Sequence, residues 1–298
     1  MDVVLLHNEK AGNESWSKKE LVRLVRDAGY EPQYYSVKTA LEHPDLLEKG
    51  EFVIVAGGDG AIRKTALALL GRKRALAPLP LGTANNIVRS FNLPPNPEDI
   101  IDGWRHLRRR GFDVGVIEGP WGKRHFIEGI GIGLISRSIA VIEHIDELAD
   151  YELKKAKHRL HRDLCVASAL AHELHALPAE LVFDGRRVSE AFLLLEVLNI
   201  RRAGPGMELA PHAIPWDGRF DVVTVTAAQR PKLVEIFDAR LTGRDPAGSL
   251  TTRRSRRLQL KLGAPCDIRI DDGTVRVEAD TTLEITIKPR ALEFVLPG

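Results

Sequence analysis

The first half of the chain alternates short apolar runs with segments that have the spacing of amphipathic helices. The apolar runs have strand length and occupy residues 3–6, 34–37, 52–56 and 76–81. Helical spacing follows in residues 15–28, 62–70 and 85–91. Such repeated units predict a mainly parallel sheet covered by helices. Because parallel strands end at one edge, we expect a ligand crevice after residues 6, 37, 56 and 81.

From about residue 112 the pattern changes to short strand-like runs separated by Gly, Pro or Asp. They occupy residues 112–117, 126–130, 180–183, 191–198, 220–226, 258–262, 266–270, 275–277 and 283–287. This texture is typical of an antiparallel β domain. We therefore expect a first domain at 1–112, to which a C-terminal strand at 289–298 returns. The second would span 113–288, with a helical insertion at about 138–177.

Composition narrows the class of protein without naming a partner. The 298 residues are 44% hydrophobic and 28% charged, which suits two domains with buried cores. With 43 basic and 41 acidic residues, attraction to a polyanion has to come from local patches. Cys165 and Cys266 form no metal-binding spacing, which argues against a disulfide scaffold and structural zinc. Asp2 and the short first apolar run are unlike a signal peptide, so we expect a cytoplasmic protein.

The strongest local signal is the strand-to-helix segment at residues 53–70, which contains Gly57-Gly58-Asp59-Gly60. Glycines there allow positive φ and close approach to a ligand, and the start of the next helix attracts phosphate. Beside a polyphosphate, the Asp59 carboxylate would hold Mg²⁺ or accept a proton. The alternative is a turn that uses Gly and Asp for geometry and helix capping alone.

Two similar loops follow other predicted strands. They are His7-Asn8-Glu9-Lys10-Ala11-Gly12-Asn13 and Pro80-Leu81-Gly82-Thr83-Ala84-Asn85-Asn86. Each alone is more simply explained as an Asn-rich turn. Three Gly-containing loops with Asn or Thr donors at one sheet edge, however, favour a nucleotide-binding site.

These residues resemble the diacylglycerol kinase catalytic domain family, which includes sphingosine kinases and bacterial lipid kinases. Residues 8–12 resemble its NPxAG loop, 57–60 its GGDGT loop, and 80–86 its PLGTxND segment. Residues 110–115 resemble a segment that contributes a second acid, here Asp113. Further matches are residues 210–221 with the P-x-A-x-x-x-DG-x-LD stretch, 270–273 with the DGE turn, and 289–297 with the closing strand.

The resemblance implies an α/β fold, with a phosphofructokinase-like nucleotide-binding domain plus a second, antiparallel β-rich domain for the lipid. It implies a kinase that uses ATP and Mg²⁺ to phosphorylate a diacylglycerol- or sphingosine-like hydroxyl. Asp272 would be the general base, Asp59 and Asp113 would order the catalytic Mg²⁺, and Asp217 would help to hold a structural Mg²⁺. The nucleotide would be lined by Asn8, Thr39, Gly58, Gly60, Thr83 and Asn85, and the expected site is completed by Gly12, Gly57, Gly82 and Lys64.

Four polar or acidic positions of the family differ in this chain. Ala61 replaces a Thr, Lys64 a Glu, Asn86 an acid and Thr274 a Glu. Lys64 would either neutralise phosphate or be an ordinary surface lysine. Asp271, Asp280 and Asp59 compete with Asp272 for the role of base. Two alternatives stay open: an NAD kinase-like enzyme, which would share the GGDG loop, and a catalytically weak nucleotide- or lipid-binding regulator.

Basic runs occupy residues 105–110, 154–162 and 253–261. Each is either a solvated face or a contact with an anionic membrane, which attracts such segments. Because aromatic residues are not interleaved with them, we expect no nucleic-acid partner. The expected partner is a lipid substrate at a membrane surface that the protein visits peripherally. The sequence does not fix the oligomeric state, and a homodimer is compatible with it.

Overall fold

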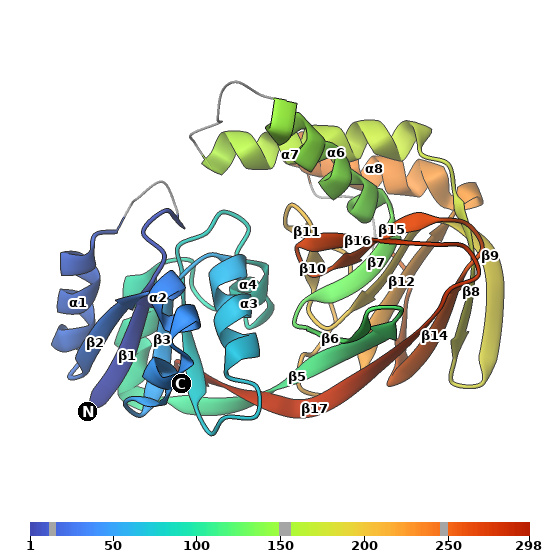
Figure 1. Ribbon diagram of the computed structural model, residues 1–298. Coiled ribbons are helices and arrows are strands. Elements are labelled where there is room, and N and C mark those ends of the chain that lie inside the picture. The colour runs from blue at the N-terminus through green and yellow to red at the C-terminus, as the bar shows by residue number, and fades with distance from the viewer. Residues whose placement is uncertain (12–15, 149–155, 245–249) are drawn as a thin grey trace. The chain divides into compact units, whose positions relative to one another are not determined.

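The computed structural model describes residues 1–11, 16–148, 156–244 and 250–298, and it divides into two compact units (Figure 1). Unit 1 comprises Met1–Asp113 and Pro289–Gly298, and unit 2 comprises Val114–Lys288. Strands β5 (Arg108–Gly119) and β17 (Thr282–Leu296) each contribute residues to both units. Within the described ranges, no helix is long and apolar enough to span a membrane.

Unit 1 contains a parallel sheet with the strand order β2-β1-β3-β4-β17. Its strands are β1 (Asp2–His7), β2 (Glu31–Ser36), β3 (Phe52–Gly57), β4 (Ala75–Pro80) and the end of β17. Every residue of β3 and β4 is buried, as is all of β1 except its first residue. Strands buried on both faces need continuous apolar runs, which is why the sequence marks them clearly.

The helices of unit 1 follow the strands. They are α1 (Lys18–Asp27), α2 (Val37–Glu42), α3 (Asp59–Ala68), α4 (Asn86–Ser90) and α5 (Pro97–Asp102), with short 3-10 turns η2 (Pro44–Glu48) and η3 (Gly103–His106). The sequence places Val37 in a strand, but it begins α2. The Ser36 side chain accepts the Thr39 N–H and caps the helix there, so the strand ends at Ser36.

Unit 2 is built on an antiparallel sheet with the order β16-β15-β7-β9-β8-β14-β17. Its strands are β6 (Gly122–Phe126), β7 (Gly129–Gly133), β8 (Leu177–Phe183), β9 (Arg186–Leu198), β12 (Phe220–Thr226), β13 (Thr252–Ser255), β14 (Arg257–Leu262), β15 (Cys266–Ile270) and β16 (Gly273–Val277). Strand β12 pairs with β9 and β13, β6 pairs with β5, and β10 (Arg202–Ala203) pairs with β11 (Met207–Glu208). The predicted antiparallel, β-rich second part is thus confirmed.

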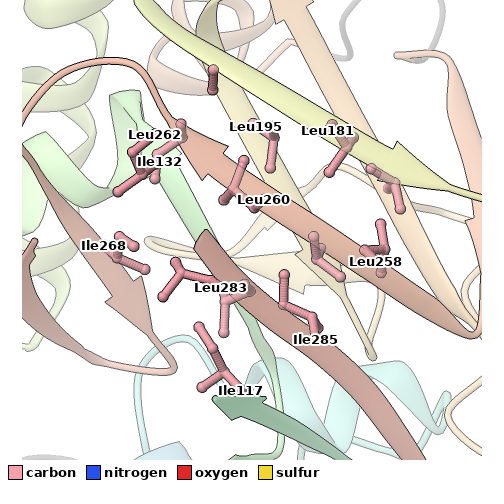
Figure 2. Packing of buried hydrophobic residues seen from close by; sticks show 14 of the residues in the cluster. Ile117, Ile132, Leu181, Leu195, Leu258, Leu260, Leu262, Ile268, Leu283 and Ile285 are labelled. Atoms are coloured by element: carbon pink, nitrogen blue, oxygen red, sulfur yellow. The ribbon is translucent and has the colours of Figure 1, made fainter. Parts of the chain in front are cut away.

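The core of unit 2 lies on the inner face of these strands (Figure 2). Leu258, Leu260 and Leu262 of β14 are buried there, and the residues between them are exposed. They pack with Leu181, Leu195, Leu283 and Ile285 from neighbouring strands. The period of two therefore predicts correctly which face of β14 is buried.

A second apolar cluster in unit 2 joins the sheet to three helices (Figure 1): α6 (Leu134–Leu148), α7 (Ala156–Glu173) and α8 (Arg230–Leu241), the last preceded by the turn η4 (Ala227–Gln229). The predicted insertion at 138–177 is shifted, since α6 begins directly after Gly133 and Leu177 opens β8. The sequence analysis missed α8. Apolar residues occur nearly all around this helix, so no polar face marks it as amphipathic.

Candidate functional site

Three loops meet where the parallel strands of unit 1 end. The strands are level at this edge, because His7 pairs with Ala56 and Gly57 pairs with Pro80. Two backbone hydrogen bonds continue the ladder beyond the strands, from the Asn8 N–H to the Ala56 carbonyl (2.9 Å) and from the Leu81 N–H to the Gly57 carbonyl (2.9 Å). The structure thus brings together the loops after β1, β3 and β4, as the parallel sheet predicts.

Glycines at this edge let the loops touch. A Cβ added to Gly82 would lie 2.5 Å from the Gly58 Cα, closer than real Cβ atoms come. A Cβ on Gly57 would lie 2.7 Å from the Ala61 Cβ and 3.5 Å from the Asn8 Cβ. None of these three glycines has a positive φ, so the predicted use of positive φ is wrong for them. They are needed for close approach of backbone to backbone.

Asp59 ties two of the loops together. It is the first residue of α3, and its carboxylate accepts the N–H groups of Asn86 (2.8 Å) and Ile87 (3.0 Å), the first residues of α4. The capping alternative considered for this residue therefore applies, but to a helix other than its own. A charge-assisted bond to two amides holds the carboxylate firmly within the loop cluster.

Asn85 closes the loop after β4. Its Oδ1 accepts the Gly82 N–H (3.0 Å) and its Nδ2 donates to the Gly82 carbonyl (2.8 Å), so the side chain is buried in its own loop. Its backbone has φ 49°, a left-handed conformation that Asn tolerates. Thr83, inside this ring, is half-buried. The expected role of Asn85 in lining a nucleotide stays a prediction, and its visible role is to shape the loop.

The other residues expected to contact the nucleotide lie on helices α2 and α3, outside the contact between the glycine loops. Thr39 is exposed in the first turn of α2, where its Oγ lies 2.8 Å from the Ser36 Oγ. Gly60 is half-buried in the first turn of α3. Lys64 is exposed in the second turn of α3, as an ordinary surface lysine would be. Gly12 lies outside the described residues.

Asp113, the second acid expected at the catalytic metal, is completely buried in β5. Its Oδ1 accepts the N–H of Arg290 at 2.7 Å. Arg290 has φ 50°, and Gly111 leaves room for its aliphatic stem. The carboxylate therefore stabilises an unusual backbone conformation in β17, and its role at a metal stays a prediction.

The tip of the β15–β16 hairpin in unit 2 carries Asp271 and Asp272, which lie in very different surroundings. Asp271 is buried with φ 56°, and its carboxylate accepts N–H groups from Ile127 (3.1 Å), Glu128 (2.8 Å) and Gly129 (3.3 Å). Asp272 is exposed. Asp271 thus anchors the hairpin, and Asp272 is the carboxylate that the hairpin presents to solvent.

A buried ion pair, formed by Arg269 of β15 and Glu196 of β9, supports the same hairpin. Arg269 and Glu196 are both fully buried, with Nη2 and Oε2 2.5 Å apart, and Arg269 Nη1 also donates to the Asp271 carbonyl at 2.7 Å. Burial raises the pKa of Glu196, and the nearby guanidinium opposes that rise. Gly131 makes room for the pair, because a Cβ there would collide with the Glu196 carboxylate. The sequence analysis missed this network, whose only local signal is the Gly129-Ile130-Gly131 spacing.

Asp217, the residue expected at a structural Mg²⁺, has partners within the protein, and its role at a metal stays a prediction. Its carboxylate is ion-paired with Arg254, and its Oδ1 accepts the Arg219 N–H at 3.0 Å. Asp221, four residues on, is 1% exposed, and its Oδ2 has no hydrogen-bond partner among the described residues. Burial raises the pKa of Asp221 to about 6, and His212 opposes this. The sequence analysis missed Asp221 as a special site because its burial depends on the fold.

A hydrogen-bonded trio beside the Asn8 loop was also missed. Tyr34 donates to Glu9 at 3.0 Å, and His7 Nδ1 lies 3.0 Å from the same phenol oxygen. Burial lowers the pKa of His7, whereas burial and Glu9 raise the pKa of Tyr34 to about 12. A neutral His7 with a proton on Nδ1 donates to Tyr34, and the trio fixes the start of the Asn8 loop.

Among the residues that the structure describes, no three His, Cys, Asp or Glu side chains gather in one place. A Mg²⁺ ion usually takes only one or two carboxylates when substrate phosphates supply further oxygens. The expected roles of Asp59 and Asp217 at a metal stay predictions.

Solved structures share the fold of this chain. A crystal structure described as a diacylglycerol kinase from Bacillus anthracis str. Sterne matches with a TM-score of 0.68 and 17% identity, covering 99% of this chain and 96% of that one. Yeast NADH kinase complexed with NADH matches with a TM-score of 0.56 and 8% identity, covering 100% of this chain and 83% of that one. At such low identity these matches show the fold, and they confirm the predicted fold class.

Sequence comparisons show the family. A "Probable lipid kinase YegS-like" of Pseudomonas fluorescens is 27% identical, covering 99% of this chain and 95% of that protein. A "Diacylglycerol kinase" of Mycobacterium tuberculosis is 28% identical over 62% of this chain and 58% of that protein. The model of the diacylglycerol kinase catalytic domain matches residues 2–117, and that of the YegS C-terminal NAD kinase beta sandwich-like domain matches residues 145–296. The resemblance read from the motifs is therefore confirmed. The chain belongs to the family of lipid kinases that combine these two domains, and such kinases are phosphotransferases.

Proposed function

We propose that this chain transfers the γ-phosphate of ATP, with Mg²⁺, to the hydroxyl of a diacylglycerol- or sphingosine-like lipid. The observation that carries the proposal is the contact of the glycine loops after β3 and β4, with Asn8 beside them. The start of α3, a helix of ten residues, follows the first of these loops, and its positive dipole end would attract phosphate oxygens. The start of α4 does not compete, because the Asp59 carboxylate takes its first two N–H groups.

The acceptor hydroxyl needs a base, and the surroundings of four aspartates favour Asp272. Asp271 is buried under three backbone N–H groups, and Asp59 accepts two. Asp280 is exposed like Asp272, but the resemblance matches residues 270–273, and with them Asp272, to the family's DGE turn. Asp272 is exposed on an anchored hairpin. In the proposed reaction Asp272 takes the hydroxyl proton, the lipid oxygen bonds to the γ-phosphorus, and the bond to the ADP oxygen breaks.

When bound, Mg²⁺ would neutralise the phosphate charges, and Asp59 is the residue best placed to contact it or its waters. The N–H groups of Asn86 and Ile87 hold the Asp59 carboxylate within the loop cluster, beside the start of α3. Ala61, which stands where the family has Thr, is buried against Gly57 and offers no ligand. Phosphoryl transfer on this site would therefore depend on positioning by backbone amides more than on side-chain ligands.

The test is a transfer assay with radiolabelled ATP and separate acceptors in mixed micelles: diacylglycerol, monoacylglycerol, sphingosine, phosphatidylglycerol and NAD. We expect a labelled lipid with Mg²⁺ and none with EDTA. Asp272→Asn should lower kcat at least about 100-fold, since general bases contribute on that scale. Asp280→Asn, which makes the same change at another exposed turn, should keep the wild-type rate.

Other outcomes point to the alternatives. Label on NAD alone would identify an NAD kinase-like enzyme, which the fold also accommodates. ATP binding in calorimetry without transfer to any acceptor would identify a regulator. Full activity of Asp272→Asn would refute the assigned base without refuting the kinase.

A further inference from the structure

Exposed arginines surround the closed end of the β8–β9 hairpin in unit 2. Arg186 opens β9 and is the cross-strand partner of Phe183, the last residue of β8. The Arg253 guanidinium lies 5.7 Å from the centre of the same Phe183 ring. Because cross-strand partners share one face of a sheet, the two cations flank one buried ring. Both arginines are exposed.

Two more arginines lie beside this turn, at the ends of β12 and β13. The Ser255 Oγ donates to Asp184 Oδ1 at 3.3 Å, which fixes the end of β13 against the hairpin. The β12–β13 ladder ends at the pair of Phe220 with Ser255, so Arg219 and Arg256 lie one step beyond it, just outside the two strands. Both are exposed. We call Arg186, Arg219, Arg253 and Arg256 the hairpin-end patch.

The patch carries positive charge that the protein leaves uncompensated. No carboxylate of the described residues lies within ion-pair distance of its four guanidinium groups, although the exposed Asp184 carboxylate lies at the same turn. Neighbouring arginines differ in this respect, because Arg187 pairs with Glu180 and Arg257 pairs with Glu284. Like charges on adjacent strands repel each other, so a surface anion at this end would relieve the repulsion.

The chemistry of the patch fits a surface dense in phosphate groups. Guanidinium groups bind phosphate oxygens in a planar, two-point geometry. Nucleic acid is a poor fit, since bases stack on exposed aromatic rings, and the rings here, Phe183 and Phe220, are buried. The exposed large apolar residues of the described ranges, Met1, Ile145 and Leu148, lie elsewhere in the sequence, so docking would be electrostatic.

We propose that the hairpin-end patch docks the protein onto the surface of an anionic phospholipid bilayer. The choice of a lipid surface rests on the proposed function, because a lipid kinase must reach an acceptor that resides in a membrane. Each exposed cation close to such a surface increases binding by about fivefold. The four arginines together give reversible, salt-sensitive binding, in contrast to insertion of an apolar segment.

The experiment is sedimentation of the full-length protein with vesicles, without ATP or an acceptor lipid. Vesicles contain either phosphatidylcholine alone or equal parts of phosphatidylcholine and phosphatidylserine. We expect binding to the mixed vesicles only, and a loss of binding in high salt. Arg186→Gln with Arg256→Gln should weaken the binding about 25-fold, about fivefold for each charge. This variant spares Arg253, which packs on Phe183, and Arg254, which pairs with Asp217.

A matched control removes two exposed arginines of unit 2 from other elements, Arg124→Gln with Arg137→Gln. It should bind within about twofold of the wild type, since its charge change is the same but lies outside the patch. Equal binding by the two double variants would overturn the proposal. So would binding to pure phosphatidylcholine, or a patch effect on a DNA duplex without one on vesicles.

The outcome is separable from that of the kinase assay. In mixed micelles of neutral detergent, the patch variant should phosphorylate the acceptor at the wild-type rate. Failure of every acceptor would refute the proposed function and leave the vesicle result intact. Normal activity with unchanged vesicle binding would refute the docking surface alone.

Discussion

Asp221→Asn should make the protein more stable at neutral pH, although it removes a native charge. Asp221 is 1% exposed and its Oδ2 has no hydrogen-bond partner among the described residues. Its pKa in the folded protein is about 6, against an ordinary value of 3.8. That difference corresponds to roughly 3 kcal/mol of disfavoured ionisation. An Asn side chain has nearly the same shape and carries no charge to bury.

The sign of the pH dependence follows from the raised pKa. Between about pH 4 and pH 6 the folded state keeps a proton on Asp221 that the unfolded state loses, so the free energy of unfolding falls as the pH rises through this window. At about pH 7.5, Asp221→Asn should raise the free energy of unfolding by about 1–2 kcal/mol, since the unpaired amide offsets part of the gain. Below about pH 4 the advantage should vanish.

Urea denaturation at several pH values, in EDTA, measures the difference between variant and wild type. Asp280→Asn is the control, because it makes the same chemical change at an exposed turn where φ is also positive. A variant that is less stable than the wild type at about pH 7.5, or whose difference does not change between about pH 4 and pH 7.5, would refute this account of Asp221.

Three further predictions concern the loops and the hairpin. Gly82→Ala should lower kcat/KM for ATP at least about tenfold, because a Cβ 2.5 Å from the Gly58 Cα must force the loops apart; unchanged kinetics would contradict this. Asp271→Asn should lower the free energy of unfolding in urea by about 1.5–3 kcal/mol, because three N–H groups lose their charged acceptor. The backbone itself should tolerate the change, since Asn accepts a φ of 56°. A cost under about 0.5 kcal/mol would contradict the anchoring role of Asp271. Because burial lowers the pKa of His7, the neutral imidazole contributes fully to the free energy of unfolding above its ordinary pKa of 6.5, and this contribution falls as the pH drops. Tyr34→Phe removes the hydrogen bond to His7 and should cost a further 1 kcal/mol or so. An NMR titration that gives His7 a pKa at or above 6.5 would refute this account.

The sequence predicts the parallel sheet of unit 1 well because its strands are buried on both faces. Residues 52–56 and 76–81 must then be continuously apolar, and their loops must gather at one edge whatever the side chains do there. The convergence of Asn8, Gly58 and Gly82 follows from that topology. Prediction from pattern succeeds here because the feature depends on the order of the elements and hardly on atomic detail.

The chemistry of individual carboxylates could not be predicted in this way. The partners of Asp59 lie 27 and 28 residues further along the chain, and those of Asp271 lie more than 140 residues earlier. Asp221 is special because the fold removes it from water, which no local pattern records. The ion pair of Asp217 with Arg254 likewise joins residues that are far apart in the sequence. These contacts depend on tertiary packing, and a motif specifies only the residue type.

Several acids in or near the motifs that resemble the family have a structural role, which limits what an inactive variant would prove. Asp59 caps α4, Asp113 holds the left-handed Arg290, and Asp271 anchors its hairpin through backbone N–H groups. Removing any of these carboxylates leaves buried or half-buried N–H donors without an acceptor, which costs about 1–3 kcal/mol of stability each. Loss of transfer at these positions therefore has to be measured beside stability. Asp272 differs because it is exposed, so a stable but inactive Asp272→Asn would identify chemistry directly.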